Sequence, residues 1–132
     1  MSVFLDTGPF IAFDDPRDQN HARAVDCFSR LREVRLATSL PVLTETATRG
    51  ATLMGCEKIA ILVRRVLSNK HYQVLDVSRQ VFIEALDLMV KYDDQGLSLT
   101  DCTSIVIMRA LRIRKIFTFD AAFRRLGYEV IP

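Results

Sequence analysis

Short apolar segments alternate with longer amphipathic segments along the whole chain, and this alternation limits the possible folds most strongly. The short segments, such as Val3-Phe4-Leu5, have the length and composition of buried strands. The longer segments repeat apolar residues every three or four positions, as in helices that bury one face. Strands separated by whole helices need crossover connections. The sequence therefore predicts an α/β fold with a mostly parallel sheet and helices on both faces.

The pattern predicts the position of each element. Strands are expected at residues 2–5, 35–38, 72–75, 115–119 and 128–131. Helices are expected at residues 8–13, 20–34, 40–53, 56–68, 79–91, 100–111 and 120–126. Ser39 is the expected N-cap of the third helix, and Asp76 or Ser78 that of the fifth.

The fifth predicted helix, which reaches Lys91, has an apolar face. Its residues Phe82, Ala85, Leu86 and Met89 recur at helical spacing. Such a face normally packs against the rest of the protein. We therefore expect these side chains to lie together on one side of the helix.

Length and composition indicate an ordinary globular domain. The chain has 132 residues, of which 49% are hydrophobic and 26% charged, which excludes intrinsic disorder and suits one domain rather than two. No apolar run approaches the roughly 20 residues that cross a bilayer, so no membrane association is expected. The N-terminal apolar run ends at Asp6, too early for a signal peptide. We therefore expect a cytoplasmic protein.

Cysteine and histidine usage gives no indication of a zinc site. Cys27, Cys56 and Cys102 lie far apart within apolar stretches, and His21 and His71 are isolated from one another. We expect buried or inert thiols rather than metal ligands or disulfides. The net charge of +2 permits a nucleic-acid partner without requiring one.

Four acidic residues are expected at one edge of the predicted sheet. Asp6 directly follows the first strand and Asp120 the fourth, whereas Glu45 and Asp101 lie near the starts of two helices. Ligands of open parallel sheets bind at the carboxyl ends of the strands. Carboxylates gathered there repel one another unless a cation lies between them, and Mg²⁺ and Mn²⁺ prefer such oxygen ligands. The four acids therefore predict a metal site that could activate water for phosphodiester cleavage.

Each of these acids also has a purely structural interpretation. Asp6 and Asp120 could be helix N-caps, and Asp101 could form a capping box with the serine three positions earlier. Glu45 lies beyond the first helical turn, so capping is not open to it. An exposed pair with Arg49, one turn later, is its structural alternative.

Four stretches, in order and spacing, resemble the PIN-domain family. They are residues 3–11 (VFLDTGPFI), 38–45 (TSLPVLTE), 99–105 (LTDCTSI) and 116–123 (IFTFDAAF). The likeness covers essentially the whole chain, whose short length is most similar to the VapC-like toxins of toxin–antitoxin pairs. Gly8-Pro9 departs from the family pattern, but Pro9 suits the first turn of the short helix.

The resemblance implies one PIN-like nuclease domain over residues 1–132, built as a three-layer α/β/α sandwich. It also implies a Mg²⁺- or Mn²⁺-dependent endoribonuclease. The implied catalytic and metal-binding residues are Asp6, Glu45, Asp101 and Asp120. Thr7 and Thr118 are the implied substrate-binding residues, and Asp120 is the most peripheral of the acids.

The same resemblance implies an RNA substrate and, for a toxin, a small cognate antitoxin. An exposed apolar helical face would also permit a homodimer. Three alternatives stay open: a solitary PIN-domain nuclease without an antitoxin, a catalytically weak binding module, and a metal-dependent phosphatase. The phosphatase would normally need a second acid two residues after Asp6, where the sequence has Gly8.

Basic residues form separate groups along the chain. They lie at residues 64–65 with Lys70, at 109–115, and at 124–125. Each group could hold RNA phosphates, or could be a solvated helix face. The sequence has no stretch of interleaved aromatic residues that would predict a base-stacking platform.

Overall fold

The computed structural model describes all residues, 1–132, and contains one five-stranded sheet in the order β3-β2-β1-β4-β5. The strands are β1 (Ser2–Leu5), β2 (Arg35–Ser39), β3 (Tyr72–Leu75), β4 (Lys115–Phe117) and β5 (Glu129–Ile131). Every neighbouring pair is parallel. The predicted α/β class is confirmed, and the sheet is parallel throughout.

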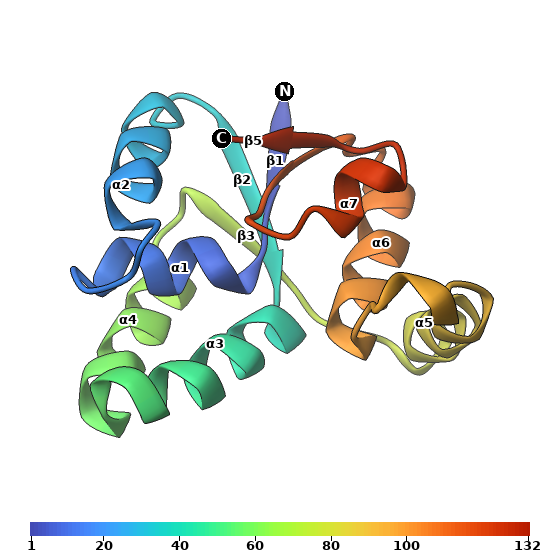
Figure 1. The fold of residues 1–132 in the computed structure, drawn as a ribbon, viewed down its shortest axis with the longest axis horizontal. Coiled ribbons are helices and arrows are strands. Elements are labelled where there is room, and N and C mark those ends of the chain that lie inside the picture. Colours follow the sequence, from blue (N-terminus) through green and yellow to red (C-terminus); the bar gives the residue numbers. More distant parts are fainter.

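Helices cover both faces of the sheet (Figure 1). One layer holds α1 (Thr7–Asp14), α2 (His21–Arg30), α3 (Leu40–Met54) and α4 (Cys56–Ser68). The other holds α5 (Arg79–Lys91), α6 (Leu99–Leu111) and α7 (Ala122–Arg125), with a 3₁₀ turn at Asp93–Gln95 between α5 and α6. The fold is therefore the three-layer sandwich that the resemblance implied.

The strand order places a switch point in the middle of the sheet. The chain runs outward from β1 through β2 to β3, then returns to β4 on the other side of β1. Val3, Phe4 and Leu5 of this central β1 are fully buried. In open parallel sheets, ligands bind at the carboxyl ends of the strands that flank such a point. Here that position lies just beyond Leu5 and Phe117.

Most predicted elements are confirmed, and β3 and α4 match residue for residue. The differences fall at element ends. α2 stops at Arg30 rather than residue 34, β4 stops at Phe117 rather than residue 119, and α7 begins at Ala122 rather than residue 120. Thr118 and Asp120 thus lie just beyond β4: the Thr118 N–H still donates to the Ile131 carbonyl of β5, whereas the Asp120 N–H donates to the Thr118 side chain.

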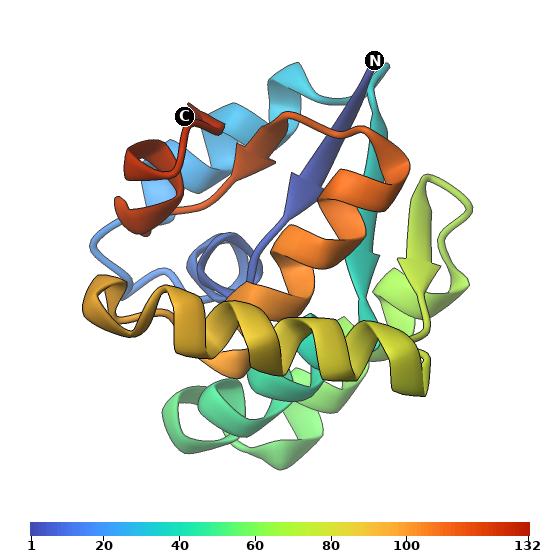
Figure 2. The same cartoon turned by 90° about the vertical axis from the view of Figure 1, so that its right-hand side faces the viewer.

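The apolar face predicted for α5 is only partly buried. Ala85 is buried, but Phe82, Leu86 and Met89 are 46%, 37% and 37% exposed. Figure 2 shows the reason: α5 (gold) lies in front of α6 (orange), at the outside of the molecule, and no further element covers it. It therefore buries only a narrow stripe, made of the expected Ala85 and of Leu88, which was not expected.

Two further expectations concern cysteines and membranes. Cys27 and Cys102 are buried, whereas Cys56 is exposed at the start of α4. All three thiols are free. No helix has both the length and the apolar character needed to span a bilayer.

Gly50 allows α3 and α4 to approach closely. A Cβ at this position would overlap the buried side chain of Ile59 on α4. We expect Gly50→Ala to lower the free energy of unfolding by about 1–3 kcal/mol, although alanine favours helix, because overpacking outweighs propensity. Urea denaturation would measure this, with Thr52→Ala on the exposed side of α3 as control. An equally stable Gly50→Ala variant would contradict the close packing.

Candidate active site

Asp6 is buried at the carboxyl end of β1, with 7% of its surface exposed. Its Oδ2 accepts a hydrogen bond from the Thr118 hydroxyl at 2.7 Å. Its Oδ1 is buried and has no hydrogen-bond partner. Asp6 occupies the N-cap position of α1, but its side chain makes no capping hydrogen bond, so capping does not account for this carboxylate.

This environment disfavours the charged form of Asp6. Burial raises the pKa of the carboxyl from 3.8 to about 6, and the neighbouring charges of Asp101 and Glu45 act in the same direction. The hydrogen bond from Thr118 opposes the shift only in part. Because buried polar atoms normally have partners, the free Oδ1 indicates a position where a cation would compensate the carboxylate.

Glu45 projects from the second turn of α3 and is held by Thr7. The Thr7 hydroxyl donates to Glu45 Oε2 at 2.6 Å, and Thr7 itself is only 1% exposed. The expected alternative, an ion pair with Arg49, is absent from the salt bridges of the structure. Since the hydroxyl of Thr7 is committed to Glu45 and buried, its placement favours a positioning role over the substrate contact expected from the sequence.

Asp101 takes part in a capping box at the start of α6. The Ser98 N–H donates to Asp101 Oδ2 at 2.9 Å, and the Asp101 N–H donates to the Ser98 hydroxyl at 3.1 Å. The structural interpretation is therefore confirmed. The capping box uses only one of the two carboxylate oxygens of Asp101. Burial raises the pKa of Asp101, and the charges of Asp120 and Glu45 add to this effect, so the residue also lies in the field of the other acids.

Asp120 is the exposed member of the set. Its Oδ1 accepts from the Ala122 N–H at 2.9 Å, although the N-cap position of the short α7 is Ala121 rather than Asp120. Its own N–H donates to the Thr118 hydroxyl oxygen at 3.0 Å. Thr118 thus joins Asp6 and Asp120 through one hydroxyl group, which makes it a positioning residue for both.

All four predicted acids line one cleft with a volume of about 330 Å³. Gly8, Arg49, Ser98, Thr118 and Phe119 complete its wall. No three acidic, histidine or cysteine side chains are already close enough to hold an ion between them. The acids surround the cleft rather than closing a coordination shell. This arrangement of oxygen donors fits Mg²⁺ or Mn²⁺, which keep several waters, and the free Oδ1 of Asp6 provides an unsatisfied ligand.

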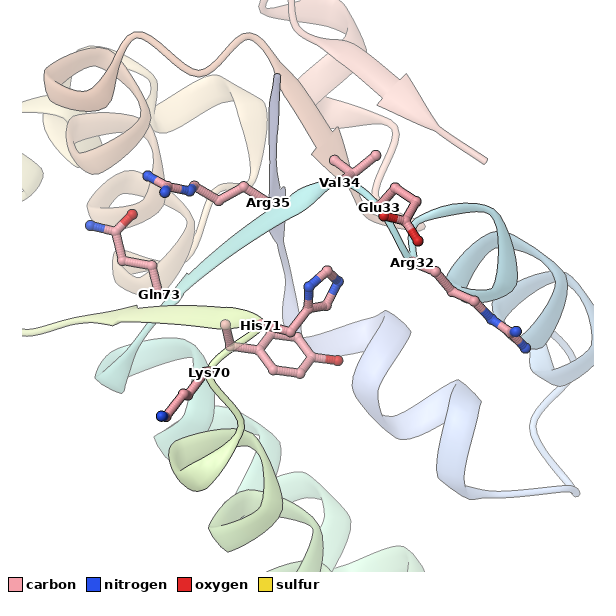
Figure 3. Close-up of a pocket in the computed structure, with 8 residues that line it drawn as sticks. Arg32, Glu33, Val34, Arg35, Lys70, His71 and Gln73 are labelled. Carbon is pink, nitrogen blue, oxygen red and sulfur yellow. The ribbon is translucent and has the colours of Figure 1, made fainter.

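A second hollow, of about 600 Å³, lies at the opposite edge of the sheet, around the start of β2 and β3. Figure 3 shows that the cationic ends of Arg32, Arg35 and Lys70 point in different directions there, away from His71. These side chains converge on no common point. The acid-lined cleft is therefore the better candidate for chemistry, although it is smaller.

The predicted basic groups are mostly far from the acids. Lys115 lies at the amino end of β4 and pairs with Glu129 at 3.4 Å, and Arg114 donates to the Gly127 carbonyl at 2.8 Å. Only Arg124 lines a cleft that adjoins the acids. Sequence reasoning missed Arg23, which lines that same cleft, because it stands alone within α2.

Comparison with known proteins agrees with this geometry. The model of the PIN domain family matches residues 3–128, and the chain belongs to this family. It is 26% identical to ribonuclease VapC26 of Mycobacterium tuberculosis, over 98% of this chain and 100% of that protein. It is 28% identical to the 23S rRNA-specific endonuclease VapC20 of the same species, over 98% of each.

Solved structures show the same fold. The crystal structure of M. tuberculosis VapC20, described as a sarcin–ricin loop cleaving toxin, aligns with a TM-score of 0.91 and 26% identity, over 98% of this chain and 99% of that one. FitAcB from Neisseria gonorrhoeae aligns with a TM-score of 0.66 at 16% identity, over 100% of this chain and 97% of that one. The second likeness bears on the fold alone.

The Thr7–Glu45 hydrogen bond provides a test of the site that leaves every acid in place. Thr7→Val keeps the side-chain shape but removes the 2.6 Å bond to Glu45. We expect the Mn²⁺ concentration needed for half-maximal RNA cleavage to rise roughly tenfold or more, as for other residues that orient metal ligands. Thr46→Val is the matched control, since the hydroxyl of Thr46 bonds only within α3. Equal metal requirements in the two variants would contradict the positioning role.

Proposed function

We propose that this protein is a Mg²⁺- or Mn²⁺-dependent endoribonuclease and the toxin of a toxin–antitoxin pair. The observation that carries the proposal is the buried, unpartnered Oδ1 of Asp6 in a cleft lined by Glu45, Asp101 and Asp120. The names of the relatives support RNA as the substrate class, because they match over nearly the full length of both chains.

Asp6, Glu45, Asp101 and Asp120 would hold the metal. A bound divalent cation lowers the pKa of a water molecule and stabilises negative charge on phosphoryl oxygens. The chain prepares the ligands for it: Thr118 fixes Asp6 and Thr7 fixes Glu45. Burial raises the pKa of Asp6 to about 6 and also raises that of Asp101, so the charged forms of both carboxyls are disfavoured in the absence of a cation.

The residues around the acids suit a phosphodiester substrate. Arg49 lies on the wall of the cleft and has no carboxylate partner, so its charge is available to a phosphate. No histidine lines the cleft. The acids and their positioning threonines are therefore the groups of this chain placed to orient the water.

Cleavage of a labelled single-stranded RNA tests this proposal. We expect cutting with Mg²⁺ or Mn²⁺, none with EDTA, and products with 5′-phosphate and 3′-hydroxyl ends. Hydrolysis of a small phosphomonoester without any cutting of RNA would favour the phosphatase. RNA binding without cutting in any metal would favour the weak binding module.

We further propose two protein partners, a small cognate antitoxin and a second copy of this chain. A nuclease toxin must be restrained in the cell that makes it. α5 exposes apolar side chains of the kind found at protein interfaces, among them Ile83 and Val90, which are 45% and 74% exposed. Growth arrest on expression of this chain alone would support the toxin, and its absence would favour a solitary nuclease. Light scattering would show whether the purified chain is a dimer.

A further inference from the structure

A second cleft continues from the acid-lined one. It has a volume of about 300 Å³ and shares Thr118, Phe119 and Asp120 with it. From this common wall it extends between the start of α2 and α7. A ligand that reaches the acids can therefore fill both clefts at once. The volume is at the lower end of the range for small-ligand sites, which suits a single nucleotide.

Phe119 forms an aromatic surface in this second cleft. Its ring is half-buried and packs edge-on against Phe117, with ring centres 5.9 Å apart. A Cβ at Gly8 would lie 3.4 Å from the ring, so Gly8 leaves room for it. These contacts support the ring from the protein side. An aromatic ring fixed in this way can stack with a nucleobase of any identity.

Arg23 covers this ring from the solvent side. Its guanidinium carbon lies 5.4 Å from the centre of the Phe119 ring, and the side chain is exposed on α2. A guanidinium plane on an aromatic face occupies the place that a nucleobase would take. Because Arg23 has no carboxylate partner, it is free to move outward and cover the other face of a base.

The charges of the second cleft differ from those of the first. Arg23 and Arg124 line it, and Asp120, at the common wall, is its one acid. The backbone of a nucleic acid carries negative charge at every residue, which arginines neutralise. Asn20 adds a side-chain amide to the wall, and its Oδ1 accepts from Arg23 Nη1 at 3.4 Å. Cation, aromatic ring and amide together are the groups that bind single-stranded RNA.

We propose that this second cleft binds the nucleotide next to the scissile phosphate, with its base stacked between Phe119 and Arg23 and its phosphate near Arg124. The inference rests on the proposed ribonuclease function and adds the subsite that holds the substrate. It requires the RNA to be single-stranded at this point, since a paired base cannot enter the stack.

Binding of a fluorescently labelled single-stranded RNA, followed by anisotropy, tests the subsite apart from catalysis. We would measure it in EDTA and again in Ca²⁺, in samples whose RNA is shown by gel electrophoresis to be intact. Phe119→Leu keeps an apolar side chain against Phe117, and we expect it to weaken binding about tenfold. Phe119→Tyr should bind within about twofold of wild type, because it keeps the ring. Arg23→Gln should weaken binding and reduce its salt dependence, whereas Arg79→Gln, exposed at the start of α5, should change binding little.

An oligonucleotide of the same length without bases completes the test. On this abasic backbone, wild type and Phe119→Leu should bind equally, because only the phosphates remain to be recognised. Equal binding of the two proteins to normal RNA would overturn the subsite, and so would an equal loss on both ligands. If Phe119 proves essential for binding but no metal supports cleavage, the subsite stands and the nuclease proposal fails. If RNA is cleaved but its binding depends on neither Phe119 nor Arg23, the nuclease proposal stands and the subsite fails.

Discussion

Glu45→Gln and Asp101→Asn should each lower the rate of RNA cleavage by about 10³-fold while the protein stays folded. Both changes remove a charge from the acid-lined cleft and keep the size of the side chain. A metal-activated water and charge stabilisation at the phosphate contribute several kcal/mol to such reactions, and each 1.36 kcal/mol corresponds to a factor of ten in rate. Single-turnover cleavage in saturating Mn²⁺ would measure the loss.

The other acids give a graded expectation. Asp120→Asn should lower the cleavage rate only about tenfold, because Asp120 is exposed and one of its oxygens already accepts from the Ala122 N–H. Asp94→Asn, an exposed acid in the turn after α5, is the matched control and should cut like wild type. If Glu45→Gln and Asp101→Asn also cut like wild type, the assignment of the active site is wrong.

Asp6→Asn should make the metal-free protein more stable at neutral pH. In the unfolded chain Asp6 titrates near 3.8, and in the folded protein its pKa is about 6 because of burial. The folded state therefore binds the proton more tightly. The stabilisation that comes from this tighter proton binding is fully present below pH 3.8 and is lost as the pH rises through 6. A pKa shift of this size corresponds to a loss of at most about 3 kcal/mol in the free energy of unfolding at neutral pH. The side-chain amide of the variant does not ionise, so the variant avoids this loss.

Urea denaturation of both proteins in EDTA, from pH 5 to pH 8, would measure this difference. The advantage of Asp6→Asn should grow with pH across this window. Adding Mn²⁺ at pH 7.5 should stabilise the wild type and leave the variant nearly unchanged, because binding to the folded state alone stabilises it. If the wild-type protein were more stable than Asp6→Asn in EDTA at every pH, the claim that Asp6 is a buried carboxylate without a compensating charge would be wrong.

Much of the fold follows from local signals in the sequence. Apolar runs such as Val3-Phe4-Leu5 and the Ser39 N-cap mark their elements clearly, since the Ser39 side chain does accept from the Val42 N–H. The ends of β4 and α7 were misplaced where side chains compete with the backbone. The Thr118 hydroxyl bonds the Asp6 side chain and the Asp120 N–H, and the apolar pattern of residues 115–119 does not reveal this.

Orientation of helices was harder to predict than their existence. The periodic pattern of α5 predicts a buried face, but periodicity does not say whether a helix lies on the sheet or outside another helix. α5 packs on α6, so Leu88 is buried while Phe82 is exposed. Predicting this requires the layer in which each helix lies, which is a property of the whole fold.

The candidate site was predicted as a set of residues, not as a network. Asp6, Glu45 and Asp101 follow from their places relative to strands and helices, because parallel strands end at one edge. The hydrogen bonds that hold these acids do not follow from local positions in the sequence. The bonds from Thr7 to Glu45 and from Thr118 to Asp6 join residues 38 and 112 positions apart. The pairing of Arg23 with Phe119 is equally invisible in a search for neighbouring aromatic residues.

Anomalous diffraction from crystals of the wild-type protein grown with Mn²⁺ tests most directly whether the acids form a metal site. We predict a manganese peak in the cleft lined by Asp6, Glu45, Asp101 and Asp120, within about 2.5 Å of the Oδ1 of Asp6. A cleft without a peak at a saturating Mn²⁺ concentration, or a peak that leaves this oxygen unpartnered, would contradict the account.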